Sequence, residues 1–84
     1  MKPIILSAHA EVRLRERDLN LSWVEAAVRT PDWTETDPKE PKVQRRFRPI
    51  SEFGSRVLRV ACIETDKEIR VISAMFDRRA KRKP

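Results

Sequence analysis

The stretch Ser7–Arg17, SAHAEVRLRER, decides how the first half of this chain folds. Its serine is a favourable N-cap, because the hydroxyl can accept a hydrogen bond from an open backbone N–H of the first helical turn. At about 100° per residue, Leu6, Ala10 and Leu14 then form one apolar stripe. The stretch therefore predicts a helix that ends near Asp18 and packs on the rest of the fold through that stripe.

Charged residues occupy two sides of this predicted helix. Glu11 and Arg15 lie on the outer side, where an i,i+4 pair of opposite charges stabilises a helix. The inner arc and its edge carry the only histidine of the chain, one carboxylate and two guanidiniums. These residues are His9, Arg13, Glu16 and Arg17. The helix thus presents one solvated set of charges and one set that is aimed inward.

The segments on either side of this helix are predicted to form a short strand and a second helix. Before it, the β-branched pair within Lys2–Leu6 predicts a short edge strand. After it, Ser22 and Glu25 form a capping box for a second helix, which must stop by Thr30 because Pro31 disfavours helical geometry in the residue before it. Four residues can form the apolar face of this second helix. They are Trp23, Val24, Ala27 and Val28.

In the second half of the chain the hydrophobic pattern changes from helical to alternating, which indicates strands. The predicted strands are Trp33–Thr36, Val43–Arg48, Arg56–Glu64 and Glu68–Phe76. Helices can cover only one face of such a sheet. The second apolar face, interrupted by Arg45, Arg59 and Ser73, is therefore expected to be a shallow groove or a partner surface. The fold class is α+β: a short N-terminal strand, a two-helix hairpin, and an antiparallel sheet of three or four strands.

Length and charge describe a small domain with a basic end. A chain of 84 residues forms one domain with a small core, which we assign to residues 1–77. The run RRAKRK at 78–83 holds five of the nineteen cations, and the rest of the chain carries 14 cations against 13 carboxylates. The tail at 78–84 is either a solvated end or an electrostatic arm for RNA, DNA or an acidic protein. Its cations are Arg78, Arg79, Lys81, Arg82 and Lys83.

Several classes of protein are excluded by composition. The apolar run Ile4–Leu6 is far shorter than a signal-peptide core of about 7–15 residues or a membrane span of about 20, so we expect a cytoplasmic protein with no membrane partner. Cys62 is the only cysteine, which excludes an intramolecular disulfide and a cysteine-rich zinc site, and we expect it in the core. One glycine and one histidine are too few for a phosphate-binding glycine loop or a metal-ligand motif. We therefore predict neither a cofactor nor a metal.

The residues His9, Arg13, Glu16 and Arg17 are the candidates for catalysis. A histidine, a carboxylate and two guanidiniums can supply the base, the acid and the fixed cations that cleave a phosphodiester without a metal. A structural interpretation stands beside this one, in which His9 is structural and an arginine pairs with Glu16 or with an acid of the sheet. In this interpretation a buried ion pair of Glu16 and Arg17 locks the helix to the sheet. His9 and Glu16 are two turns apart, about 10 Å along the axis, so they can act together only across a bound substrate.

A second constellation consists of arginines on two strands that are expected to pair. These are Arg45, Arg46, Arg48, Arg56 and Arg59. The planar fork of arginine suits phosphate, so the set is a candidate nucleic-acid surface; the alternative is a charged strand edge that resists aggregation. Strand alternation separates Arg46 and Arg48 from Arg45. Trp23 and Trp33 are expected to pack in the core or between helix and sheet rather than to stack on bases.

Four segments together resemble a family of prokaryotic proteins, the domain of unknown function 4258. They are the helix pattern His9-Ala10-x-x-Arg13-x-x-Glu16-Arg17, the stretch Arg29–Trp33, the strand Arg56–Val60, and the closing Val71–Arg79. The resemblance covers nearly the whole chain. It implies a fold similar to the RelE and ParE toxins of toxin-antitoxin systems, with a strand, two helices and an antiparallel sheet of three further strands. The chain has no tyrosine, a residue that some relatives of that fold place near the scissile phosphate.

The resemblance and the residues lead to three functional hypotheses. The first is a toxin-like, metal-independent ribonuclease that acts on RNA or at the ribosome and is held by an antitoxin. The second is a non-catalytic module that binds RNA or an acidic protein through the basic tail and the sheet arginines. The third is an interaction protein whose second sheet face docks an antitoxin helix or another copy of the chain.

Overall fold

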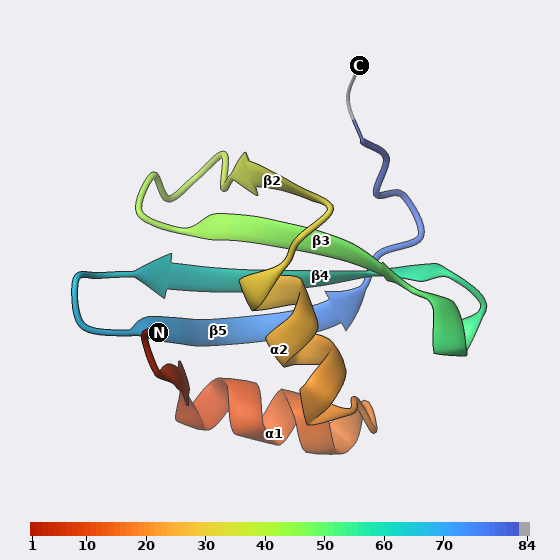
Figure 1. Cartoon of the computed structure of the whole chain (residues 1–84), viewed down its shortest axis with the longest axis horizontal. Helices are drawn as coiled ribbons and strands as arrows, with labels where there is room; N and C mark the ends of the chain where they lie inside the picture. The colour runs from red at the N-terminus through yellow and green to blue at the C-terminus, as the bar shows by residue number, and fades with distance from the viewer. Residues whose placement is uncertain (83–84) are drawn as a thin grey trace.

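Five strands form one mixed sheet, and two helices pack against it (Figure 1). The structure is a computed structural model of the chain and describes residues 1–82. The elements are β1 (Ile4–Leu6), α1 (Ala8–Glu16), α2 (Leu21–Arg29), β2 (Trp33–Thr36), β3 (Gln44–Ile50), the 3-10 turn η1 (Ser51–Phe53), β4 (Arg56–Glu64) and β5 (Ile69–Phe76). The α+β class and the order of elements predicted from the sequence are confirmed.

The strand order in the sheet is β1-β5-β4-β3-β2, so β1 and β2 are its edges. β1 runs parallel to β5, and all other neighbours are antiparallel. β1 begins at Ile4 rather than Lys2, because Pro3 has no N–H and contributes only its carbonyl, which accepts from the N–H of Ile69. β3 extends past Arg48 to Ile50, since the hairpin with β4 keeps its register through Pro49.

Helix α1 begins at the predicted N-cap. The Ser7 hydroxyl accepts a hydrogen bond of 3.0 Å from the Ala10 N–H. The helix ends at Glu16, two residues earlier than predicted, because Asp18 takes a left-handed conformation with φ of 52°. The N–H of Leu19 then bonds to the carbonyl of Leu14 at 2.9 Å, which completes a Schellman-type stop.

Helix α2 begins two residues earlier than the predicted capping box implies. Its N-cap is Asn20, whose side-chain oxygen accepts from both the N–H and the hydroxyl of Ser22, at 2.9 and 2.8 Å. The capping box of Ser22 with Glu25 is therefore wrong. Asparagine caps a helix as well as serine does, and here Asn20 precedes the first apolar residue of the helix, Leu21.

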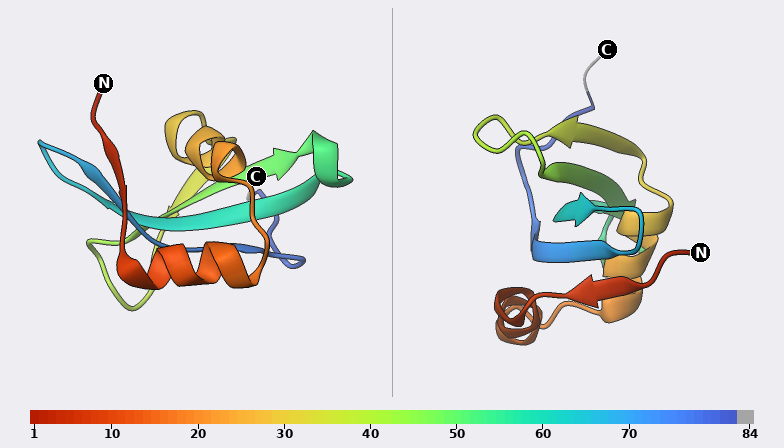
Figure 2. Two further views of the ribbon diagram at one scale, coloured as in Figure 1. Left: turned by 90° about the horizontal axis from the view of Figure 1, so that it is seen from below. Right: turned by 90° about the vertical axis from the view of Figure 1, so that its left-hand side faces the viewer.

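The two helices are steeply inclined to each other, so the expected hairpin is an open one (Figure 1). α2 crosses in front of the sheet and α1 lies beside β5, as the turned views also show (Figure 2). Between the helices and the sheet lies the core, in which Cys62 is buried and has a free thiol. Its other buried members are Ala10, Leu14, Val24, Ala27, Val28, Ile50, Leu58, Val60, Ile69, Val71 and Ala74.

The opposite side of the sheet carries no helix, and we call it the helix-free face. Strand register places one row of side chains across it, from Trp33 through Phe47 and Arg59 to Met75. A second row runs from Glu35 through Arg45 and Ala61 to Ser73. Phe47 is buried and stacks on Trp33, with ring centroids 4.7 Å apart and planes within 4°. The remaining apolar residues of this face on β4 are half-buried.

The connection from β3 to β4 is a short turn at one end of the sheet. It consists of η1 followed by Gly54 and Ser55, both with left-handed backbone, at φ of 64° and 57°. Glycine adopts this conformation without steric cost, and a second left-handed residue sharpens the reversal. The turn leaves Phe53 at the surface with 41% of its area exposed. It therefore brings an aromatic ring to the end of the sheet where β5 finishes.

Candidate nucleic-acid interface

The structure brings together three of the four candidate catalytic residues. Arg13 donates from Nε to Nε2 of His9 at 3.4 Å and from Nη1 to Oε1 of Glu16 at 3.2 Å. The three side chains thus form a row along α1 with Arg13 at its centre. The Arg13–Glu16 ion pair is open to water, with side-chain exposures of 40% and 57%.

This row has the groups for acid-base chemistry, and its side chains are open to water. A pair exposed to this degree contributes at most about 1 kcal/mol, because water screens it. His9 is also exposed, and it contacts Arg13 rather than Glu16. A substrate phosphate on this helix would have to draw Arg13 away from its two present partners.

Arg17 takes a structural position instead. Its Nη1 donates to the carbonyl of Ala74 at 2.8 Å, and the Ser7 hydroxyl donates to the carbonyl of Ile72 at 3.4 Å. Both carbonyls lie on β5 beyond the short strand β1, so they face no strand of their own sheet. The ion pair of Glu16 with Arg17 that was considered from the sequence is therefore wrong. Adjacent residues of a helix point about 100° apart, and Glu16 reaches Arg13 one turn earlier.

Two arginines of β3 hold the C-terminal end of α2. Arg46 is 8% exposed, and its Nη1 donates to the carbonyl of Val28 at 2.9 Å. Its other guanidinium nitrogens bond to Gln44 at 2.8 Å and to Glu64 at 2.5 Å. Arg48 donates to the carbonyl of Thr30 at 2.7 Å.

Cations are favourable at this position, because the last carbonyls of a helix are unpaired and carry its negative dipole end. The contacts give Arg46 and Arg48 a structural role. They also engage all three nitrogens of the buried Arg46, so this residue is not available to a phosphate.

Two more of the five predicted strand arginines, Arg45 and Arg59, lie on the helix-free face and are paired. Arg45 contacts Asp37 at 3.2 Å, and Arg59 contacts Asp77 at 3.0 Å. The pKa of Asp37 is lowered, chiefly by the backbone N–H of Lys39 and with a contribution from Arg45. These pairs neutralise the two cations at rest. Only about a quarter of each guanidinium side chain is exposed, at 28% for Arg45 and 26% for Arg59.

A cluster of three aromatic rings lies where η1, α2 and β5 meet, and we call it the aromatic end. The ring centroids of Phe53 and Phe76 are 4.9 Å apart, and Trp23 lies 5.7 Å from Phe53 and 6.0 Å from Phe76. The Trp23 indole donates to Glu52 at 3.1 Å. Hydrogen bonds from the Ser51 hydroxyl and from this indole lower the pKa of Glu52. Trp23 therefore both packs against the sheet end, as expected, and borders the surface.

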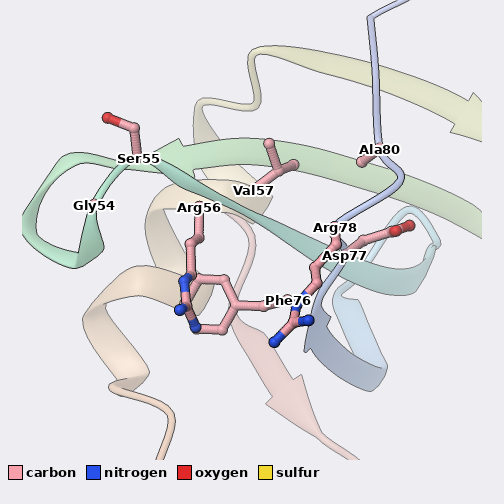
Figure 3. A pocket seen from close by; sticks show the side chains of 8 residues that line it. All are labelled: Gly54, Ser55, Arg56, Val57, Phe76, Asp77, Arg78 and Ala80. Carbon is pink, nitrogen blue, oxygen red and sulfur yellow. The ribbon is translucent and has the colours of Figure 1, made fainter.

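Beside the aromatic end lies a pocket of about 510 Å³ (Figure 3). Its lining residues are Gly54, Ser55, Arg56, Val57, Phe76, Asp77, Arg78 and Ala80. Arg56 and Arg78 extend from their backbones in the same direction, with the Phe76 ring between them in this view. The Arg56 guanidinium also lies over the Phe53 ring, 4.9 Å from its centroid. The pocket thus combines two guanidiniums with an aromatic wall.

The charge of this pocket is positive. Among residues 1–82, neither Arg56 nor Arg78 has a carboxylate within ion-pair distance. The one carboxylate in the lining, Asp77, is engaged by Arg59 and by the N–H of Arg79 at 2.9 Å. An anion that enters the pocket therefore meets two unneutralised cations.

The basic tail continues from this pocket. Arg79 and Lys81 are exposed, and Arg82 lies 3.7 Å from Asp32 in a pair that is open to water. Lys83 falls outside the described residues. The last turn of the sheet and the beginning of the tail thus carry a run of solvent-accessible cations next to the aromatic end.

Sequence reasoning missed Phe53 and gave Arg56 no special place among the arginines. One signal was available. Phe53 immediately precedes the only glycine of the chain, and an aromatic residue beside a left-handed turn is poorly placed to enter a core.

Two further properties of the described residues bear on function. Within residues 1–82, no three His, Cys, Asp or Glu side chains lie close enough to hold a metal ion. Neither α1 nor α2 combines the length and the apolar character that a bilayer span requires.

Residues 6–76 match the family model described as Domain of unknown function (DUF4258). This range runs from the last residue of β1 to the last residue of β5, so it includes both helices, four strands and the Phe76 side of the pocket. No curated protein and no solved structure matches the chain. Because the matched range covers most of its length, the chain belongs to the DUF4258 family.

Proposed function

We propose that this chain binds single-stranded RNA at the aromatic end and the adjoining basic tail. The observation that carries the proposal is the juxtaposition of Arg56 and Arg78, which have no carboxylate partner within residues 1–82, with the exposed ring of Phe53. Cations that are already neutralised gain little from a phosphate, and these two are not neutralised.

The chemistry of the surface fits a single strand better than a duplex. Unstacked bases can lie on aromatic rings or on arginine planes, and each stack contributes about 1–3 kcal/mol. Bases in a duplex are already stacked on their neighbours, so their faces are not free to stack on the ring of Phe53. Phosphates along the strand would meet the tail cations Arg79 and Lys81, which supply affinity without sequence preference.

The test is fluorescence anisotropy with a labelled single-stranded RNA of roughly ten nucleotides and the matching duplex. Phe53→Ala should weaken binding of the single strand by about tenfold, which corresponds to the loss of one stacked base. Val12→Ala is the matched control, because Val12 is a similarly exposed apolar residue on α1. Equal effects of the two variants, or tighter binding of the duplex, would remove the proposal.

The salt dependence of the same titration tests whether the basic tail contacts phosphates of the RNA. For single strands, log K falls against log salt with a slope of about −0.7 for each phosphate contact. Deleting residues 78–84 should therefore flatten the slope and weaken binding. A slope that the deletion leaves unchanged would show that the tail does not contact phosphate.

A second candidate function is metal-independent RNA cleavage, and one observation favours it: Arg13 links His9 and Glu16 into one exposed row. A phosphate that takes the place of one of these contacts would lie between a base and an acid. Cleavage should persist in a chelator and be lost in folded His9→Ala and Arg13→Ala variants. Glu11→Gln on the outer side of α1 is the control. No cleavage by the wild type, or full cleavage by both variants, excludes this candidate.

We further propose that the chain is related in fold and function to the RelE and ParE toxins. It is supported by the order of a strand, two helices and then antiparallel strands, of which this chain has four where the resemblance implies three. It implies a cytoplasmic protein, with the ribosome, an antitoxin or a second copy of the chain as partner. Induced expression should then arrest growth, and co-expression of a neighbouring small reading frame should relieve the arrest. Normal growth on induction would contradict the toxin hypothesis.

A further inference from the structure

The pocket beside Phe76 differs from the rest of the basic surface because it is concave and because two guanidiniums line it without a carboxylate partner within residues 1–82. Arg56 enters it from the start of β4, and Arg78 enters it from the chain that follows β5. These two segments are far apart in sequence but are held together by the hydrogen bond from the Asp77 N–H to the Val57 carbonyl, at 2.9 Å. The sheet therefore fixes the backbone positions from which both guanidiniums extend.

The volume of the pocket, about 510 Å³, lies in the range of about 300–1,000 Å³ that small-molecule sites occupy. The lining combines apolar and cationic groups: the Phe76 ring lies with the Arg56 and Arg78 side chains, and Val57 extends from β4 in the opposite direction (Figure 3). The only carboxylate among its described lining residues, Asp77, already accepts from Arg59. A ligand that matches these features has a compact anionic group next to a flat aromatic group.

We propose that this pocket binds a nucleotide through a terminal phosphate, held between Arg56 and Arg78, with the adjoining base against the Phe53–Phe76 side. The inference rests on the proposed function and deepens it, because it distinguishes a chain end from the interior of an RNA. A phosphomonoester carries more negative charge at neutral pH than an internal diester does. Two guanidiniums can each form paired hydrogen bonds with its oxygens.

The aromatic side gives the base a place to stack. Phe53 is partly exposed, and Arg56 lies over its ring, so a base can contact the guanidinium plane as well as the ring edge. Neither contact reads the hydrogen-bonding edge of a base. The pocket is therefore expected to prefer nucleotides over inorganic phosphate and to discriminate weakly among bases.

The experiment is calorimetric titration of the full chain with four probes: adenosine, inorganic phosphate, and adenosine monophosphate carrying its phosphate at the 5′ or the 3′ position. At least one monophosphate should bind about tenfold more tightly than either adenosine or phosphate, and the preferred isomer identifies which RNA end is recognised. Equal binding of adenosine and both monophosphates would overturn the inference, as would binding of none of the probes.

Variants locate the site. Arg56→Gln and Arg78→Gln should each weaken the preferred monophosphate by about tenfold, and Arg56→Lys should retain part of the affinity because it keeps the charge. Arg15→Gln, which removes the same charge from α1, should leave the affinity unchanged. Equal losses in Arg15→Gln and Arg56→Gln would show only a general charge effect and would overturn the inference.

The failure of this inference is distinguishable from the failure of the proposed function. An RNA with hydroxyl groups at both ends should still bind through the tail and Phe53, but less tightly than the same RNA with the preferred terminal phosphate. Equal binding of the two RNAs rejects the terminal-phosphate pocket and leaves the proposed function standing. Loss of all RNA binding, with the mononucleotide still bound, rejects the proposed function and leaves the pocket standing.

Discussion

Arg17 at the C-terminal end of α1 donates a hydrogen bond of 2.8 Å to the backbone carbonyl of Ala74 on β5. The carbonyl lies on the part of β5 that β1 does not reach, because β1 pairs only with residues from Ile69 to Val71. An exposed strand edge with unpaired carbonyls invites pairing with other chains. Arg17 and Ser7 thus cover this edge from the two ends of one helix.

The first prediction concerns this contact. Arg17→Met keeps much of the side-chain length but removes the donor, and it should lower the free energy of unfolding by about 1–2 kcal/mol. Urea denaturation followed by circular dichroism measures the change. Arg15→Met is the control, because Arg15 is exposed and makes no ion pair within residues 1–82, not even with Glu11 one turn earlier. If both variants are equally stable, the contact does not hold α1 to the sheet.

The second prediction separates the two sides of β3. Arg46→Met leaves the Val28 carbonyl without its donor and removes one of the two cations that pair with Glu64, so we expect a loss of about 2 kcal/mol or more in stability. Arg45→Met, one residue earlier on the helix-free face, should cost less than about 1 kcal/mol, because its pair with Asp37 is partly open to water. The same denaturation assay applies, and the reverse order of stabilities would contradict the assigned roles.

The third prediction is a pH dependence. Hydrogen bonds from the Lys2 ammonium and the Arg46 guanidinium lower the pKa of Glu64 from its ordinary value of 4.5 to about 2. A carboxyl whose pKa is lower in the folded state stabilises the fold fully above its unfolded pKa, and it loses that contribution as pH falls toward the folded pKa. The stability of the wild type should therefore decline as pH falls from 4.5 to about 2.

Glu64→Gln tests this dependence. The variant should be less stable than the wild type at neutral pH, and its stability should change less between pH 4.5 and about 2. Glu25→Gln, on the exposed side of α2, is the control and should keep the wild-type profile. Urea unfolding midpoints measured across this pH range compare the stability of the wild type and the two variants. Parallel profiles for wild type and Glu64→Gln would mean that another carboxyl governs acid stability.

Periodicity predicted most of the fold because most of it depends on local pattern. The alternation of Leu58, Val60 and Cys62 placed them on one face of β4, and all three are buried there. Capping was harder to predict. Asn20 and Ser22 are both good N-caps, and the sequence does not say which one is extended and which one is already helical.

The site was less predictable than the fold, because it depends on contacts between residues far apart in the chain. Arg46 and Arg56 look alike as charged residues on neighbouring strands. Only the structure shows that Arg46 is buried against the end of α2 while Arg56 borders an open pocket. The i,i+4 spacing of His9 and Arg13 did indicate that these side chains are neighbours, and they are in contact.

The most direct test of RNA binding at the aromatic end uses the two tryptophans as reporters. Trp23 belongs to the aromatic end, whereas Trp33 stacks on Phe47 on the helix-free face. The chain has only these two tryptophans, so Trp33→Phe leaves Trp23 as the sole emitter and Trp23→Phe leaves Trp33. Titration of both variants with single-stranded RNA should change the emission of Trp23 with a saturating curve and leave the emission of Trp33 nearly constant. A change confined to Trp33, or none in either variant, would contradict RNA binding at the aromatic end.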